Sequence, residues 1–192
     1  MERRNLMNII DELEWRGAIN QQTDAEGLYK LVDKKSISLY CGIDPTGDSM
    51  HIGHLIPFMI LKRFQLAGHH PVILIGGGTG AIGDPSGRTT ERVLQTAEQV
   101  KHNADSLTAQ MKKLFGEDGS FTMMNNYDWL SKISLLDFLR DYGKLFNINT
   151  MLAKDVVASR METGISFTEF SYQILQSIDY KMLYEKCGVQ LQ

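Results

Sequence analysis

The chain has 192 residues, 43% of them hydrophobic, and carries 20 Lys and Arg against 23 Asp and Glu, a net charge of −3. This composition is typical of a globular domain with a sizeable core, and the slight acidity argues against a domain that grips nucleic acid on its own. The two cysteines imply no disulfide framework, no apolar run approaches the ~20 residues of a membrane span, and the N-terminal residues lack the apolar core of a secretory signal. We therefore expect a cytoplasmic protein that does not insert into a membrane.

Two short amphipathic helices are predicted at the N-terminus. The first has apolar residues at helical spacing between positions 6 and 13 and ends at Gly17. The second opens at residues 23–26, Thr-Asp-Ala-Glu, which fit a capping box. Neither helix carries obvious chemistry.

A strand, a tight loop and a helix follow at residues 37–41, 44–49 and about 51–67. With a second apolar run at 72–75 they form a βαβ unit, which predicts a parallel sheet. The helical spacing is carried by Ile52, Leu55, Ile56, Met59, Ile60 and Phe64. Pro57 bends this helix if Ser49 is the N-cap and is harmless if the helix starts later, and the sequence does not decide between these.

The start of this helix favours an anion, because unpaired backbone N–H groups and the positive end of the helix dipole meet there. His51 and His54 lie three residues apart on one face, and both can donate hydrogen bonds to phosphate oxygens. A capping or space-filling role for the two histidines is the alternative. A metal pair is a further interpretation, although it lacks a neighbouring glutamate or a cysteine cluster.

The glycine-rich segment 76–88 allows close approach of a ligand to the backbone. Residues 78–83 match the Gly-x-Gly-x-x-Gly fingerprint of dinucleotide-binding proteins, which makes an NAD-dependent oxidoreductase the rival hypothesis. Two features oppose it: Asp-Pro-Ser-Gly at 84–87 interrupts the expected helix, and the next strand, 121–124, ends in two asparagines rather than an acidic residue.

The remaining elements are mainly helical. They are a long helix from about 90 to 115, the strand at 121–124, a helix at 136–142 with a cap at Ser134 to Asp137, a helix at 149–161, a helix from a capping box at Ser166 to near Gly188, and the opening of a strand at 189–192. Tyr172, Gln176 and Asp179 line one face of the last helix. Without context, a solvated face is the simpler interpretation of this polar stripe.

Four strings resemble the bacterial-type tyrosyl-tRNA synthetases, a family of class I aminoacyl-tRNA synthetases. They are Pro-Thr-Gly-Asp-Ser-Met-His-Ile-Gly-His at 45–54, Gly-Asp-Pro-Ser-Gly at 83–87, Asn-Asn-Tyr-Asp-Trp at 125–129 and Thr-Gly-Ile-Ser-Phe-Thr-Glu-Phe-Ser-Tyr at 163–172. The resemblance covers nearly the whole chain. It implies an α/β fold: a Rossmann-like nucleotide-binding domain with a parallel sheet, cut after its first half and connecting insertion.

The resemblance also implies the chemistry of a tyrosine–tRNA ligase. The carboxylate of L-tyrosine attacks the α-phosphorus of ATP, and the resulting adenylate then passes its tyrosyl group to tRNA(Tyr). The family pattern assigns catalytic positions to His51, His54, Thr46, Arg88 and Arg92, the two arginines by the weaker match. It assigns ATP contacts to Cys41, Gly42, Asp44, Gly53 and Asn126, and tyrosine contacts to Tyr40, Asp84, Tyr172, Gln176 and Asp179. Mg2+ is expected with the ATP phosphates, without a protein-bound metal.

The family continues past residue 192 with the rest of its sheet, a lysine-rich loop and tRNA-binding domains, so the resemblance implies an N-terminal fragment. We expect residues 1–126 to hold the N-terminal helices and the first half of the catalytic domain, and 127–192 the insertion and the tyrosine-binding helix. The family forms homodimers through the insertion, here about 127–170. A non-catalytic module that binds tyrosine or its adenylate is the alternative function.

Overall fold

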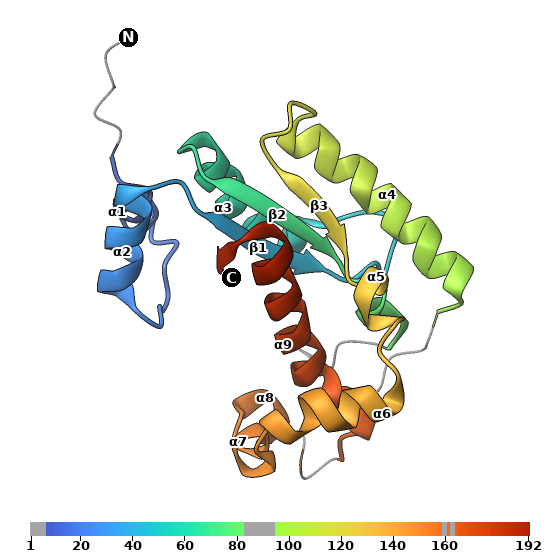
Figure 1. Ribbon diagram of the computed structural model, residues 1–192. Coiled ribbons are helices and arrows are strands. Elements are labelled where there is room, and N and C mark those ends of the chain that lie inside the picture. The colour runs from blue at the N-terminus through green and yellow to red at the C-terminus, as the bar shows by residue number, and fades with distance from the viewer. Residues whose placement is uncertain (1–6, 83–94, 159–160, 162–163) are drawn as a thin grey trace.

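A parallel sheet with helices on both faces forms the centre of the computed structural model, which describes residues 7–82, 95–158, 161 and 164–192 (Figure 1). The strands are β1 (Ser38–Ile43), β2 (His70–Ile75), β3 (Thr122–Asn125) and β4 (Val189–Leu191). Their order is β3-β2-β1-β4, and every pairing is parallel. The expected α/β class with a Rossmann-like parallel sheet is confirmed.

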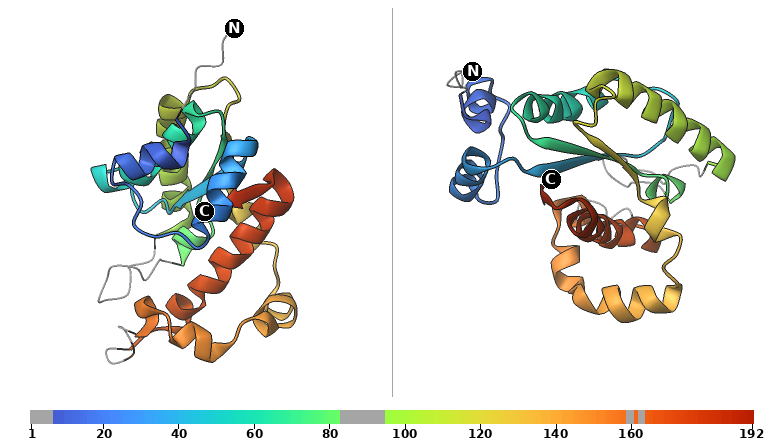
Figure 2. Two further views of the ribbon diagram at one scale, coloured as in Figure 1. Left: turned by 90° about the vertical axis from the view of Figure 1, so that its left-hand side faces the viewer. Right: turned by 45° about the horizontal axis from the view of Figure 1, so that its top comes forward.

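The described helices surround this sheet. They are α1 (Ile9–Trp15), α2 (Ala25–Lys34), α3 (Ile52–Leu66), η1 (Thr79–Ala81), α4 (Ala97–Phe115), α5 (Tyr127–Leu130), α6 (Leu135–Asp137), η2 (Phe138–Tyr142), η3 (Gly143–Leu145), α7 (Ile148–Leu152), α8 (Asp155–Ala158) and α9 (Phe167–Cys187). Figure 2 shows α3 and α4 on one face of the sheet and α9 on the other. None of the described helices combines the length and the apolar character that crossing a bilayer requires.

Alternation along the strands divides the core into two. Leu39, Ile43 and Ile73 face α1, α3 and α4, whereas Tyr40 and Val72 face α5 and α9. Both faces of the central strands are therefore buried, as a parallel sheet requires, which explains why β2 is an unbroken apolar run after its first residue.

Several predicted helix ends are confirmed. Ser166 caps α9 in a reciprocal capping box with Glu169, and Gly188 ends that helix in the left-handed conformation at φ 63°. Ser134 caps α6, accepting from the N–H of Asp137. These local signals fold as predicted because each needs only three or four neighbouring residues.

Other predicted boundaries were wrong. Asp24, not Thr23, caps α2 through the N–H of Gly27. The described part of the helix expected from residue 90 begins at Ala97, because Thr96 caps it. The segments 136–142 and 149–161 are not single α-helices: the first passes into a π-helix at Phe138–Tyr142, and a turn at 153–154 separates α7 from α8.

In helix α3 the structure settles the place of Pro57, which the sequence left open, and corrects the predicted apolar stripe. Its N-cap is His51, so Pro57 lies inside the helix and cannot donate to the carbonyl one turn earlier. Its buried side chains are Phe58, Leu61 and Phe64, whereas Ile52 is 82% exposed. The helix has apolar residues on more than one face, so helical spacing alone identified its buried face only in part.

Candidate functional site

A pocket of about 550 Å³ opens at the carboxyl ends of β1, β2 and β3, beside the point at which the chain order of the strands changes direction in the sheet. This is the place at which open α/β sheets bind ligands. Ten of the residues predicted from the sequence line it: Tyr40, Cys41, Gly42, Asp44, Thr46, His54, Asn126, Tyr172, Gln176 and Asp179. The polar stripe of α9 therefore faces a pocket rather than bulk solvent alone.

The carboxylate of Asp179 lies in the pocket wall formed by α9 and is only 3% exposed. Its Oδ1 accepts from Trp129 Nε1 at 2.8 Å, and its Oδ2 accepts from Asn126 Nδ2 at 2.9 Å. Burial raises the pKa of Asp179 to about 6, while the two donors favour the ionised form. At neutral pH the Asp179 carboxylate is therefore ionised and is a fixed hydrogen-bond acceptor in the pocket wall.

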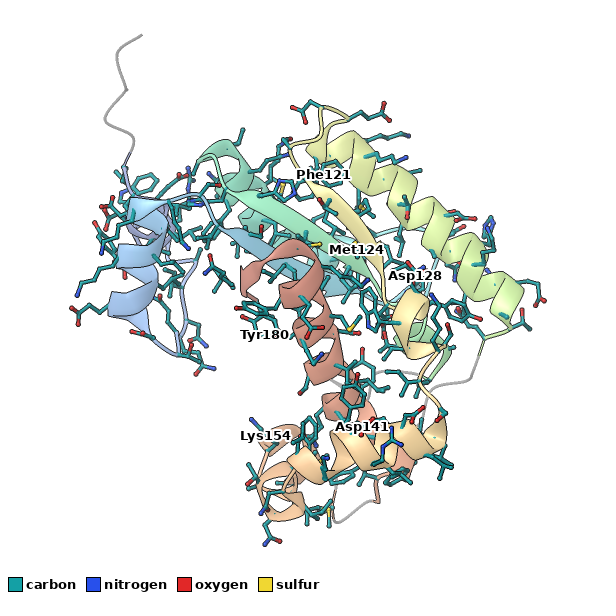
Figure 3. All side chains as sticks on the ribbon, in the orientation of Figure 1. Phe121, Met124, Asp128, Asp141, Lys154 and Tyr180 are labelled. Atoms are coloured by element: carbon teal, nitrogen blue, oxygen red, sulfur yellow. The ribbon has the colours of Figure 1, made fainter. Side chains whose placement is uncertain are left out.

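Tyr40 approaches the same wall from β1. Its ring packs against that of Tyr180, which is labelled on α9 in Figure 3, with ring centroids 5.9 Å apart. Burial, reinforced by the charge of Asp179, raises the pKa of the Tyr40 hydroxyl, which stays protonated and able to donate. A donor and an acceptor of this kind match both hydrogen-bonding roles of a phenol hydroxyl.

A second carboxylate, Asp44, follows β1 directly and is shared between two hydroxyl groups. Its Oδ1 accepts from Thr79 Oγ1 at 2.6 Å and its Oδ2 from Tyr172 Oη at 3.0 Å. Asn126 Nδ2 donates to Thr79 Oγ1 at 3.0 Å and also to Asp179. A continuous hydrogen-bonded chain therefore joins the two carboxylates across the pocket.

Asn126 is 1% exposed, and its amide is engaged on both sides. Besides its two donated bonds, its Oδ1 accepts from the N–H of Gly78 at 2.8 Å. The residue lines the pocket, but its polar atoms hold the glycine-rich turn, Thr79 and Asp179 together. Its geometry therefore indicates a supporting position for the nucleotide contact that the resemblance implied.

The two histidines form the N-terminal cap of α3. Nδ1 of His51 accepts from the N–H of Gly53 at 3.1 Å, and Nδ1 of His54 accepts from the N–H of His51 at 3.5 Å. The rings stack with centroids 3.6 Å apart. A nitrogen that accepts carries no proton, so each neutral ring bears its proton on Nε2 and can donate outward.

Burial and the neighbouring His51 lower the pKa of His54, so its ring is neutral at pH 7. His54 lines the pocket, whereas His51 and Gly53 lie at the start of α3 outside the lining. A capping role and a donor role of these histidines are both compatible with this arrangement, because capping uses Nδ1 and leaves Nε2 for a ligand.

The thiol of Cys41 lies on β1 at the pocket wall, and burial raises its pKa to about 11. It is therefore a neutral group at physiological pH. Three other predicted residues, Asp84, Arg88 and Arg92, lie outside the described residues.

Two residues that hold the site together were not singled out from the sequence. Thr79 is 2% exposed and connects Asp44 to Asn126, and Trp129 supplies one donor to Asp179. Thr79 lies inside the glycine-rich run, where the glycines were the more conspicuous feature. The strand-end position of this run was the signal that could have found it.

The glycines after β2 are explained by side chains that lie against them. A Cβ on Gly76 would be 1.9 Å from Asp44 Oδ1, and a Cβ on Gly80 would be 2.8 Å from Pro45 Cδ. The described part of this segment continues as the 3-10 helix η1 rather than as the α-helix that a dinucleotide fingerprint opens. The structure of this segment therefore does not support the oxidoreductase hypothesis.

Metal-ligating side chains do not gather into a group of three or more anywhere among the described residues. The donors that line the pocket include hydroxyl, imidazole and amide groups, whose chemistry suits phosphate and phenol oxygens.

Known proteins resemble this chain along nearly all of its length. The profile of the family described as tRNA synthetases class I (W and Y) matches residues 32–191. Tyrosine–tRNA ligase 1 of Enterococcus faecalis (strain ATCC 700802 / V583) is 77% identical over 186 residues, which is 97% of this chain and 44% of that protein. The tyrosine–tRNA ligase of Latilactobacillus sakei subsp. sakei (strain 23K) is 77% identical over 185 residues, 96% of this chain and 44% of that protein.

Solved structures agree with this assignment. The C-terminally truncated mitochondrial tyrosyl-tRNA synthetase of Aspergillus nidulans superposes with a TM-score of 0.86 at 36% identity and covers 95% of this chain and 55% of its own. The corresponding Coccidioides posadasii enzyme gives 0.82 at 33% identity, over 96% and 53%. The chain thus spans less than half the length of the curated relatives named above. With a parallel α/β fold and a pocket at its switch point, it belongs to the class I tRNA synthetases of the tryptophan and tyrosine group.

Proposed function

We propose that this chain is the part of a tyrosine–tRNA ligase that binds tyrosine and ATP and forms tyrosyl-adenylate. The observation that carries the proposal is the buried carboxylate of Asp179, held by two donors beside the Tyr40 hydroxyl in a pocket that His54 and Thr46 also line. A phenol is the side chain that satisfies both groups. Phenylalanine would leave them unpaired, and its strong rejection is already established for tyrosyl-tRNA synthetases rather than a prediction made from this chain.

The reaction needs no base, because the tyrosine carboxylate is ionised at neutral pH. Its oxygen bonds to the α-phosphorus of ATP as the bond to the pyrophosphate oxygen breaks, and pyrophosphate leaves. Negative charge shifts onto the phosphate oxygens, where the Nε2–H groups of His51 and His54 and the Thr46 hydroxyl are the donors that the arrangement supplies. Positioning and charge stabilisation therefore account for catalysis.

At the other end of the substrate, Tyr172, Gln176 and Asp84 are our proposed ligands for the ammonium group. Tyr172 and Gln176 line the pocket, and Asp44 fixes the Tyr172 hydroxyl. Our candidates for contacts to the nucleotide are Cys41, Gly42 and Asp44 at the end of β1, Gly53 at the start of α3, and Asn126. Arg88 and Arg92 remain proposals for pyrophosphate.

The wider role follows from the family. We propose transfer of the tyrosyl group to tRNA(Tyr), Mg2+ bound to the ATP phosphates, a homodimer formed through residues 127–170, and action in the cytoplasm. Exposed apolar side chains in that range, among them Leu135, Leu136 and Leu145 at 71%, 75% and 72% exposure, support the dimer. The expected boundary at residue 126, between the first half of the catalytic domain and the insertion, stays a prediction.

The test is tyrosine-dependent ATP–pyrophosphate exchange by the full-length product of the gene that encodes these residues. Asp179→Asn keeps the size of the side chain and removes its charge, so we expect the KM for tyrosine to rise by about ten- to a hundredfold while the KM for ATP changes little. Asp105→Asn, at an exposed ion pair on α4, is the matched control and leaves both constants unchanged. Exchange that does not depend on tyrosine would disprove the function, and binding of tyrosine without exchange would favour the non-catalytic module.

A further inference from the structure

The loop of residues 44–51, here called the β1–α3 loop, joins the strand to the helix that bears both histidines. It has no regular structure, and Thr46 and Ser49 in its middle are exposed. Within the loop, the N–H of Thr46 donates to the carbonyl of Asp44 at 2.8 Å. The contacts that fix the rest of the loop come from α4 and from Gln95 just before it, neither of which the proposed chemistry uses.

Gln110 on α4 holds the C-terminal half of the loop with both ends of its amide. Its Nε2 donates to the carbonyl of Asp48 at 2.9 Å, and its Oε1 accepts from the N–H of Met50 at 3.1 Å. One side chain thus fixes the backbone on both sides of Ser49. The N–H of Met50 lies immediately before His51, the N-cap of α3.

Asn103 on α4 holds the N-terminal half. It is 1% exposed, and its Nδ2 donates to the carbonyl of Pro45 at 3.0 Å and to Gln95 Oε1 at 3.2 Å. Gln95 in turn donates from Nε2 to the carbonyl of Thr46 at 3.0 Å. Positions 103 and 110 are about two helical turns, or roughly 10 Å, apart on one face of α4.

These contacts set the direction of the loop's peptide groups. In a planar trans peptide the N–H points opposite to the carbonyl. Since the carbonyls of Thr46 and Asp48 are drawn to the side-chain amides of Gln95 and Gln110, the N–H groups of Gly47 and Ser49 point away from those amides. No acceptor for either N–H exists among the residues that the structure describes.

Burying the amide of Asn103 on this face of α4 costs more free energy than burying an apolar side chain there. Its neighbours on the buried side include Val100, Leu107 and Met111, so a leucine at position 103 would pack there without polar groups to satisfy. The amides instead make directed bonds to the backbone of one loop, and packing alone does not require such bonds.

We propose that Asn103 and Gln110 are positioning residues for tyrosine activation: together they clamp the β1–α3 loop so that Thr46 and the two imidazoles are held where phosphate charge develops. The inference rests on the proposed function. Preorganised donors raise the rate only while their geometry holds. Small displacements of such groups lower the rate by up to about a hundredfold. Neither residue is among those that line the pocket.

The test compares Gln110→Met with Gln65→Met in the full-length protein. Gln65 on α3 is the matched control, because its Nε2 donates to the Phe115 carbonyl at 3.0 Å and to Ser120 Oγ at 2.6 Å, away from the β1–α3 loop. We expect Gln110→Met to lower kcat for pyrophosphate exchange by about ten- to a hundredfold with the KM for tyrosine unchanged. Asn103→Leu should give the same pattern, and Gln65→Met should keep the wild-type kcat.

Hydrogen exchange supplies a readout that does not depend on activity. The Met50 amide should lose protection in Gln110→Met, keep it in Gln65→Met, and keep part of it in Gln110→Glu, which retains an acceptor oxygen. Wild-type kcat in Gln110→Met, or an equal loss in Gln65→Met, would overturn the inference while the proposed function stands. Absence of tyrosine-dependent exchange in the wild type would instead refute the proposed function.

Discussion

Removing the indole donor of Trp129 should move the pH dependence of tyrosine binding. In Trp129→Phe, Asp179 Oδ1 loses a bond of 2.8 Å from Nε1 and keeps the bond from Asn126. A hydrogen bond to a charged group contributes about 1.5–3 kcal/mol, and one pKa unit corresponds to about 1.4 kcal/mol. The pKa of Asp179, about 6 in the native chain, should therefore rise by about one to two units.

The direction of the pH effect depends on which protonation state of Asp179 binds tyrosine. In the proposed complex the Asp179 carboxylate accepts the phenol hydrogen, so tyrosine affinity should fall as the pH drops through the pKa of Asp179. In Trp129→Phe the midpoint of this fall should lie at or slightly above neutral pH, and the affinity should recover at alkaline pH. Titration calorimetry with tyrosine at a series of pH values measures the midpoint. Trp15→Phe is the matched control, since Trp15 is 76% exposed on α1.

Stability gives a second readout of the same group. The native state keeps the Asp179 proton up to about pH 6, whereas an unfolded chain releases it near the ordinary value of 3.8. The native state thus binds more protons in this window, and the free energy of unfolding falls as the pH rises through it. Trp129→Phe should extend the fall to higher pH. An unshifted binding midpoint, together with an unchanged stability window, would refute this explanation of the Asp179 pKa.

Three further substitutions test other contacts. Thr79→Val removes the donor to Asp44 and should lower the free energy of unfolding in urea by about 1–3 kcal/mol, with Thr79→Ser restoring most of it. Gly76→Ala places a Cβ 1.9 Å from Asp44 Oδ1, so we expect about 1–3 kcal/mol of destabilisation and weaker ATP binding, and an unchanged melting curve would contradict the close approach. His51→Ala removes the acceptor for the N–H of Gly53 and the outward Nε2 donor; kcat should fall much more than the affinity for tyrosine, and an equal fall in both would argue against a role confined to the transition state.

Local sequence signals predicted local structure well. The caps at Ser134 and Ser166 and the glycine at position 188 need only nearby residues, and the structure confirms them. The strand positions followed from apolar runs and proved correct to within two residues. Where a competing cap lay nearby, as with Asp24 next to Thr23, composition could not choose between them.

The candidate site was likewise predictable only in part. The resemblance supplied residues that the structure brings to one pocket, such as Tyr40 and Asp179, although they are far apart in the sequence. It did not indicate how Asp179 is held, because the Trp129 bond depends on the packing of α5 against α9. The clamp from Asn103 and Gln110 carries no local pattern at all, since its acceptors and donors are backbone groups some 60 residues earlier in the chain.

The shared amide of Asn126 has a consequence for engineering. One Nδ2 group serves both Asp179, on the side that we propose for the amino acid, and Thr79, which donates to Asp44. A variant library that replaces Asp179 to admit another para substituent therefore removes one of the two acceptors and leaves one hydrogen of this buried amide without a partner, while the bonds to Gly78 and Thr79 remain. Libraries that randomise position 126 together with 179 should yield active enzymes more often than libraries of position 179 alone.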